Sequence, residues 1–268
     1  MHRDIALVAA LSVALLGLAL SSASADLDEP EGVEGWSVEE DCGQLPPEGA
    51  SASASASASA SASATQHGRA IGGLSATECH SLLARLGVSF EDAAHEGGSI
   101  AAIEEPVRLS LAGAVGEITV RPHGGDPRSI HAVLDCRLVV ALYEWGPTLR
   151  AAGFVGIEHV SVFRPGARVA GTSHASGHSH ALAIDALRFV RPDGTTFSVL
   201  DDWTARVRGA APCATYDEPA EARSLREAIC AGATAELFEV IVTPHHDDAH
   251  ANHVHLEVVP GVEWTALR

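Results

Sequence analysis

Histidine is the most unusual feature of this 268-residue sequence: there are fifteen, and eight of them fall in two short windows. The first window covers residues 173–185 and the second covers residues 245–257. A hydrolytic zinc site uses three imidazole or carboxylate ligands and leaves a fourth position for water. His178, Asp185 and His255 would supply that ligand set. The two windows together therefore predict a metal centre.

The spacing within the windows also suits a catalytic group beside the metal. His253 and His255 lie two residues apart in a predicted strand, so both side chains face the same side of a sheet. One imidazole can then bind the metal while the other faces the substrate. Asp185 lies in an apolar, alternating stretch, where an unpaired carboxylate would be costly. We therefore expect a cationic group beside Asp185.

Hydrophobic periodicity predicts the elements that position these residues. Helical spacing predicts helices over 75–86, 134–149 and 220–230, the first with a capping box from Ser75 to Glu78. Strand patterns occur at 107–111, 115–120, 157–163, 181–189, 196–200 and 254–259, and residues 237–242 are ambiguous. A turn at 191–194 joins two of these strands in a hairpin. Because there is no regular βαβ alternation, we predict an α+β fold with a mostly antiparallel central sheet and flanking helices.

The N-terminal quarter has a different character. Residues 1–25 combine Arg3, a 16-residue apolar run and a small-residue site, which predicts a cleaved secretory signal peptide. Residues 26–70 are acidic and then consist of Ser-Ala repeats, which predicts a disordered linker. The globular domain is expected over 71–268. No other segment is suited to span a membrane, so we expect no stable span after signal cleavage.

Export implies an oxidising compartment, where cysteines form disulfides by default. Cys213 and Cys230 could close a local loop, and Cys79 and Cys136 could join two helices of the core. Cys42 is left over in the acidic segment. The spacing alone does not assign the connectivity.

The charge balance limits the classes of partner. Seventeen basic residues, all arginine, stand against 35 acidic residues, giving a net charge of −18. This balance argues against nucleic acid as a partner. We expect the protein to be a monomer.

Three short motifs carry a family resemblance: Ser176-x-His178, Ala183-x-Asp185 and His253-x-His255. They resemble the zinc signature of the D-alanyl-D-alanine carboxypeptidases and murein endopeptidases. Within that group the chain is most similar to the extensin-like C-terminal domain proteins of bacteria. Supporting matches follow in the family's order over about residues 75–260. The resemblance implies the α+β architecture of these zinc peptidases.

The resemblance also implies a site and an activity. Zinc would be bound by His178, Asp185 and His255, and His253 would act as general base or stabilise the tetrahedral intermediate. Arg164 matches an arginine that holds a substrate carboxylate or carbonyl oxygen. The implied function is a periplasmic or secreted bacterial peptidase in which zinc activates water against the peptide stems or cross-links of peptidoglycan.

Several positions depart from the family pattern. Asn252 stands where some relatives keep an acidic base, which leaves His253 or a carboxylate such as Asp248 for that role. Ala181 replaces the usual glycine, His180 adds an imidazole, and two expected cysteines are missing. A non-catalytic cell-wall-binding module with a structural zinc is the main alternative. A secreted metal-buffering protein is a further one, suggested by the histidine content.

Other residues have simpler interpretations. Trp145 and Trp203 lie in apolar segments and are expected in the core. His250 matches a further family histidine and is expected close behind the ligands. The remaining polar candidates are interpreted as solvated loop or surface residues; they are His174, His245, His246, Asp201, Asp202 and Glu257, the last facing either solvent or a neighbouring arginine.

Overall fold

The computed structural model describes residues 70–204 and 206–268, which lie within one compact unit, and the predicted signal peptide and the predicted linker up to residue 69 fall outside the described residues. The helices are α2 (Ala76–Arg85), α3 (Cys136–Ala151), α4 (Val199–Asp202) and α5 (Ala220–Thr234). The strands are β1 (Phe90–Asp92), β2 (Pro106–Leu109), β3 (Ala114–Val115), β4 (Ile118–Pro122), β5 (Leu134–Asp135), β6 (Gly156–His159), β7 (Ala183–Val190), β8 (Thr196–Ser198), β9 (Val240–Val242), β10 (Val254–Glu257) and β11 (Ala266–Leu267). A short 3-10 helix, η4 (Gly177–His180), precedes β7.

An eight-stranded mixed sheet forms the centre of the domain. Its order is β11-β9-β10-β7-β6-β4-β3, and β8 pairs with β7. The pairs β4–β6 and β9–β11 are parallel, and the other pairs of this sheet are antiparallel. A second sheet has the order β1-β2-β5. The predicted α+β class with a mostly antiparallel sheet and flanking helices is confirmed.

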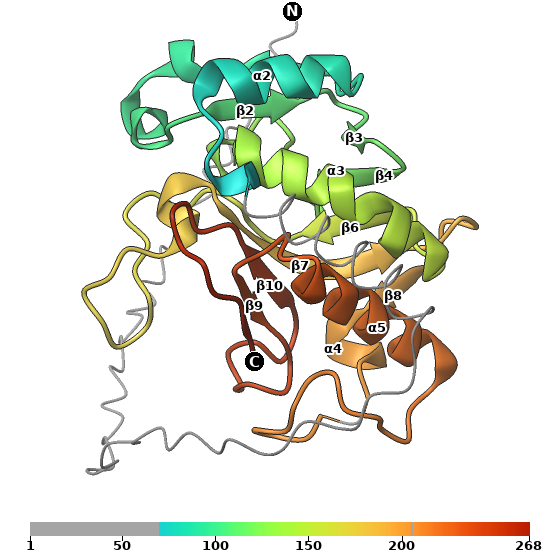
Figure 1. The fold of residues 1–268 in the computed structure, drawn as a ribbon. Coiled ribbons are helices and arrows are strands. Elements are labelled where there is room, and N and C mark those ends of the chain that lie inside the picture. The colour runs from blue at the N-terminus through green and yellow to red at the C-terminus, as the bar shows by residue number, and fades with distance from the viewer. Residues whose placement is uncertain (1–69, 205) are drawn as a thin grey trace, which may run out of the picture. The chain divides into compact units, whose positions relative to one another are not determined.

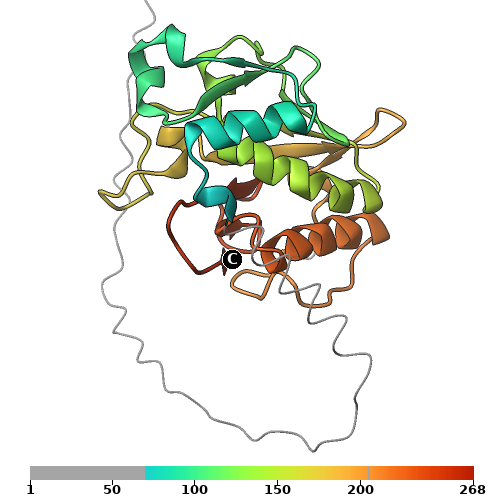
Figure 2. The same ribbon diagram turned by 45° about the horizontal axis from the view of Figure 1, so that its top comes forward.

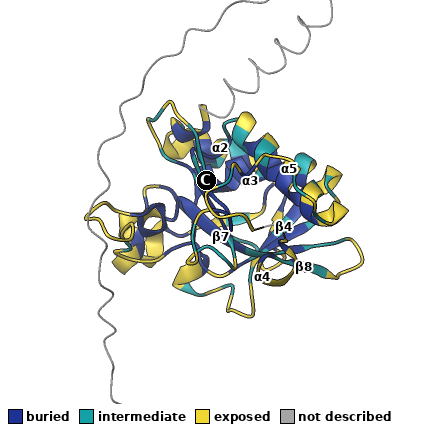
Figure 3. Cartoon of the chain, turned by 90° about the horizontal axis from the view of Figure 1, so that it is seen from below, coloured by how far each residue is buried: buried dark blue, intermediate teal, exposed yellow. Residues whose placement is uncertain are grey.

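Helices α3 and α5 lie side by side against one face of the large sheet (Figures 1 and 2). Trp145 of α3 packs edge-on against Phe189 of β7 and Phe238, and its Nε1–H donates to the carbonyl of Ala228 in α5 at 2.8 Å. A Cβ at Gly232 would lie 3.1 Å from that indole nitrogen, so α5 can approach this closely because the residue is glycine. Figure 3 shows that the strands and the inner sides of these helices are buried. The core positions predicted for Trp145 and Trp203 are confirmed.

A β-bulge in β7 changes which side chains of this strand face the helices. In the pairing with β6, Glu158 lies opposite Arg188 but His159 lies opposite Ala186, so Leu187 is the extra residue. The alternation of side chains changes phase there. Phe189 can therefore contact α3 although it lies four residues after Asp185, which projects from the other face.

Several predicted elements have different limits. The predicted strand 115–120 is the hairpin of β3 and β4, turned at Gly116, which has a positive φ of 58°. Residues 196–200 divide between β8 and α4. The strand predicted over 157–163 ends at His159, and the ambiguous segment 237–242 forms a strand only from Val240. Strands β1, β5 and β11 have two or three residues each and were not predicted, because so short a run has no measurable alternation.

Two disulfides connect the elements. Cys79 of α2 bonds to Cys136 at the start of α3, and Cys213 bonds to Cys230 of α5. Both possible pairings inferred from the sequence are confirmed, and Cys42 lies outside the described residues. The disulfides fit an oxidising compartment outside the cytoplasm. Among the described residues, no helix has the length and apolar character needed to cross a membrane.

Candidate metal centre

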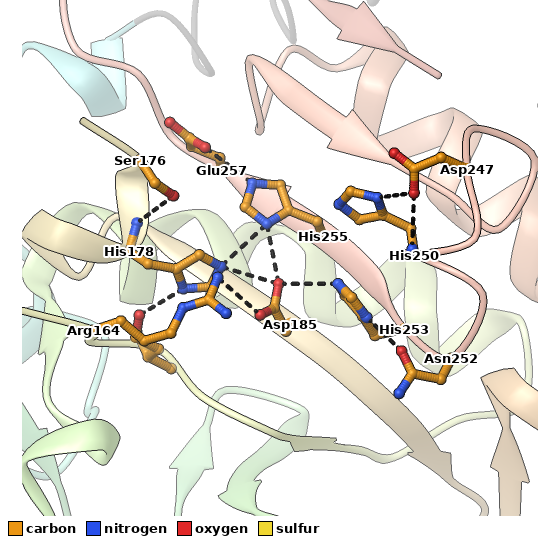
Figure 4. Close-up of polar contacts among 11 residues, drawn as sticks. Arg164, Ser176, His178, Asp185, Asp247, His250, Asn252, His253, His255 and Glu257 are labelled. Carbon is orange, nitrogen blue, oxygen red and sulfur yellow. Dashed lines mark hydrogen bonds and ion pairs between the residues drawn. The ribbon is translucent and has the colours of Figure 1, made fainter. Parts of the chain in front are cut away.

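Three side chains from two strands and the η4 turn converge on one point (Figure 4). His255 of β10 lies directly opposite Asp185 of β7, and His178 of η4 approaches both. The Nε2 atom of His178 lies 3.0 Å from Asp185 Oδ1 and 3.2 Å from His255 Nδ1, and the latter two atoms are 3.0 Å apart. All three residues are buried. These are the three residues predicted from the histidine windows.

The outer nitrogen of each imidazole is held by an acceptor. His178 Nδ1–H donates to the carbonyl of Val162 at 2.7 Å, and His255 Nε2–H donates to Glu257 Oε2 at 2.9 Å. In their neutral forms both rings therefore present a lone pair to Asp185. A neighbour on the outer nitrogen is typical of metal-binding histidines. Tetrahedral zinc ligands at about 2.0–2.1 Å from the ion are about 3.3 Å apart, so the ligand atoms need little movement to hold one.

The electrostatics of the centre are set by the buried Asp185 carboxylate, which lies between two imidazoles. Burial raises the pKa of the Asp185 carboxyl, but hydrogen bonds from His178 and His255 outweigh burial and hold the pKa well below its usual value. Burial lowers the pKa of His255, but the Asp185 and Glu257 carboxylates outweigh it and raise the pKa to about 9. Without a metal ion, a proton on His255 thus supplies the positive charge that the centre attracts.

Both predicted catalytic residues border this centre. His253 Nε2 lies 3.4 Å from Asp185 Oδ1, and burial lowers the pKa of this imidazole to about 4. The side-chain amide oxygen of Asn252 lies 2.8 Å from His253 Nδ1. Arg164 Nη2 lies 3.3 Å from Asp185 Oδ2, which is the cationic neighbour expected for this carboxylate. The guanidinium side chain is 49 % exposed.

Arg164 also lines a cleft of about 380 Å³. Val160 and Ser161, which follow β6, and His131 are among the residues that line it. His131 Nδ1–H donates to the carbonyl of Phe163 at 2.9 Å, which fixes that ring beside the loop leading to Arg164. Arg164 is the residue that the cleft shares with the surroundings of Asp185.

His250 lies behind the ligands, as predicted. Its Nδ1 is 2.6 Å from Asp247 Oδ1, and its ring lies 5.0 Å from the His253 ring and 6.2 Å from the His255 ring, measured between centroids. Figure 4 shows the ring directed toward these two histidines. Asp247 is a supporting residue that sequence analysis missed, although its position three residues before His250 was a possible signal.

Two expectations about polar residues are wrong. Glu257 does not face open solvent or an arginine, but contacts His255, one of the three candidate metal ligands. His245 is only 1 % exposed, because its ring stacks on Tyr216 at 5.0 Å and packs against Trp203. By contrast, the side chains predicted to be solvated are exposed at four positions; these are His174, His246, Asp201 and Asp202.

The structure also locates the departures from the family pattern. His180 is exposed, and its Nδ1 lies 2.9 Å from the carbonyl of Ala102 rather than at the metal centre. Asp248 is exposed and pairs with Arg208, so it is not placed as the base that replaces Asn252. Ala181 ends η4 with a positive φ of 56°, a backbone region that favours glycine. The glycine that the family resemblance leads one to expect at this position would adopt that conformation without strain.

The fold and site define an α+β domain with a buried His-Asp-His group able to bind a metal ion. Residues 77–266 match the family described as extensin-like protein C-terminus, so the chain belongs to that family. No curated protein and no solved structure matches the chain.

Proposed function

We propose that this protein is an exported, zinc-dependent peptidase that acts on peptide stems or cross-links of peptidoglycan in the bacterial periplasm or outside the cell. The observation that carries the proposal is the convergence of three buried ligand atoms within 3.2 Å of one another, bordered by His253 and Arg164. Membership of the extensin-like family and the two disulfides support the proposal.

The residues that would hold the zinc ion are His178, Asp185 and His255. A zinc ion bound there supplies a Lewis acid and lowers the pKa of a coordinated water toward neutrality. The set of two imidazoles and one carboxylate suits zinc, because imidazole is a favoured ligand of this ion.

His253 is the proposed general base. The imidazole is neutral at pH 7, because burial lowers its pKa. Asn252 cannot take a proton itself, but its amide oxygen accepts the Nδ1–H of His253 and leaves a lone pair on Nε2. That nitrogen faces Asp185, a ligand of the proposed zinc, so it lies beside the position where water would react. Asn252 therefore replaces an acidic residue as an orienting group rather than as a base.

Arg164 is the proposed substrate-binding residue. Its guanidinium contacts Asp185 on one side and lines the cleft on the other, where a carboxylate or carbonyl oxygen of the peptide can accept its hydrogen bonds. The half-exposed side chain is open to a substrate from outside the domain.

Digestion of purified peptidoglycan by the zinc-loaded full chain tests this function. We expect new peptide fragments or newly released termini, detected by mass spectrometry. His253→Ala should retain zinc and lose activity by about 10²- to 10⁴-fold, the usual contribution of a general base. His95→Ala, which changes an exposed imidazole on another segment, is the control. Unchanged cleavage by His253→Ala would refute the role of that residue.

A wall-binding module with a structural metal is the second candidate. The observation that favours it is the absence of an acidic base at Asn252 together with the outward position of Asp248. Zinc-loaded protein that sediments with peptidoglycan but releases no fragments would establish this candidate and overturn the peptidase proposal.

A further inference from the structure

Glu257 has no role in the function proposed above, yet its side chain reaches the metal centre. His255 and Glu257 are two residues apart on β10, so both project from the same face of the sheet. His255 Nε2 lies 2.9 Å from Glu257 Oε2. The contact directs the opposite nitrogen, Nδ1, toward Asp185 and His178. An imidazole without this acceptor is free to rotate or to carry its proton on Nδ1, where it blocks metal binding.

A glycine provides the space that Glu257 occupies. A Cβ added to Gly177 would lie 2.5 Å from Glu257 Cδ, 2.6 Å from Oε1 and 2.8 Å from Cγ. Real Cβ atoms essentially never make contacts this short, so the carboxylate must shift if position 177 carries a side chain. Gly177 immediately precedes the ligand His178. The turn that carries one ligand is thus packed directly on the side chain that orients another.

We propose that Glu257 is a positioning residue of the metal centre, acting through His255, and that Gly177 is required because it admits the Glu257 side chain. This inference deepens the proposed function, since it rests on the same metal centre. The Glu257 carboxylate touches neither the three ligand atoms nor the cleft, and it acts by holding a ring. Loss of such a neighbour lowers metal affinity by about 10- to 100-fold.

Zinc affinity of the full chain, measured by competition with a chromophoric chelator, tests the proposal without any peptidase assay. The titration is made at pH 9, so that protons compete little with the metal. Glu257→Ala should weaken zinc binding by about 10- to 100-fold. Glu257→Gln should stay within a few-fold of wild type, because the amide oxygen accepts the same hydrogen bond. Glu263→Ala, which removes an exposed carboxylate elsewhere, is the matched control and should leave the affinity unchanged.

The glycine supplies a second, independent arm. Gly177→Ala should match Glu257→Ala in affinity, and the double variant should be no weaker than Glu257→Ala alone, because the truncated side chain makes room for the new methyl group. In the cobalt-loaded protein, the visible absorption bands should change in Glu257→Ala but not in Glu257→Gln. Circular dichroism confirms that each variant is folded.

Three results would overturn the positioning role: wild-type affinity in Glu257→Ala, an equal loss in both Glu257 variants, or additive losses in the double variant. These outcomes are separate from failure of the proposed function. A chain that binds zinc tightly but leaves peptidoglycan intact contradicts the peptidase and leaves the role of Glu257 standing.

Discussion

Metal binding to this centre should compete with a proton on His255. The pKa of His255 is raised to about 9 when no metal is present, so at pH 7 the ring is protonated and must lose that proton to expose Nδ1. Because pH 7 lies about 2 units below this pKa, the apparent zinc affinity at pH 7 should be about 100-fold below its high-pH limit, a difference of about 2.7 kcal/mol in binding free energy. The logarithm of the affinity should therefore rise with a slope of about 1 from pH 7 to pH 9 and flatten above pH 9.

Two assays measure this competition. Chelator competition between pH 6.5 and pH 10, corrected for protonation of the chelator, gives the affinity curve. Calorimetry at pH 7 in buffers of different ionisation enthalpy counts the protons released, and about one per zinc ion is expected. An affinity that is flat between pH 7 and pH 9, with no proton released at pH 7, would refute the electrostatic account of His255.

The same proton links stability to pH. Because the pKa of His255 is higher in the folded chain than the usual value of about 6.5, the proton stabilises the metal-free fold fully below about pH 6.5 and this stabilisation is lost as pH rises through 9. The shift corresponds to about 3 kcal/mol. In urea titrations of chelator-treated protein, this group should lower the free energy of unfolding by that amount between pH 6 and pH 10. The His255→Gln variant should lack this contribution.

The remaining predictions concern stability. Replacing Cys79 and Cys136 by serine removes a disulfide that spans 57 residues and should lower the free energy of unfolding by about 4 kcal/mol. Replacing Cys213 and Cys230, which are 17 residues apart, should lower it by about 3 kcal/mol. Urea unfolding of the two double variants measures this order, and the reverse order would contradict the loop-entropy argument. Arg226→Ala leaves the buried Glu218 carboxylate without its ion-pair partner, and we expect the free energy of unfolding to fall by about 3–5 kcal/mol in the same assay. A decrease below about 1 kcal/mol would contradict a stabilising role for this pair.

Local periodicity accounts for much of what the sequence predicted correctly. The alternation around Asp185 and His255 places each side chain on a definite face of its strand, and the antiparallel pairing of β7 with β10 brings them opposite each other. The same two-residue period applied to Glu257, which lies on the His255 face. That signal was present, but a charged residue near the end of a strand was interpreted as solvated.

Contacts between distant segments account for what was missed. The burial of His245 depends on Tyr216, which lies in a loop 29 residues earlier and has no periodic pattern. The bulge at Leu187 arises from the register with β6 rather than from the sequence of β7 itself. Gly116 was a local sign of the turn between β3 and β4. Its close packing could not be predicted, because it depends on Tyr143, whose ring would lie 2.8 Å from a Cβ at position 116.

The metal content of the untagged full chain tests the central claim most directly. Mass spectrometry of the wild-type protein, and of His178→Ala and Asp185→Ala variants shown to be folded, should find one zinc ion per chain in the first and none in the other two. A wild-type chain that binds no zinc under saturating conditions, or variants that keep it, would contradict the assignment of His178, Asp185 and His255 as a metal centre.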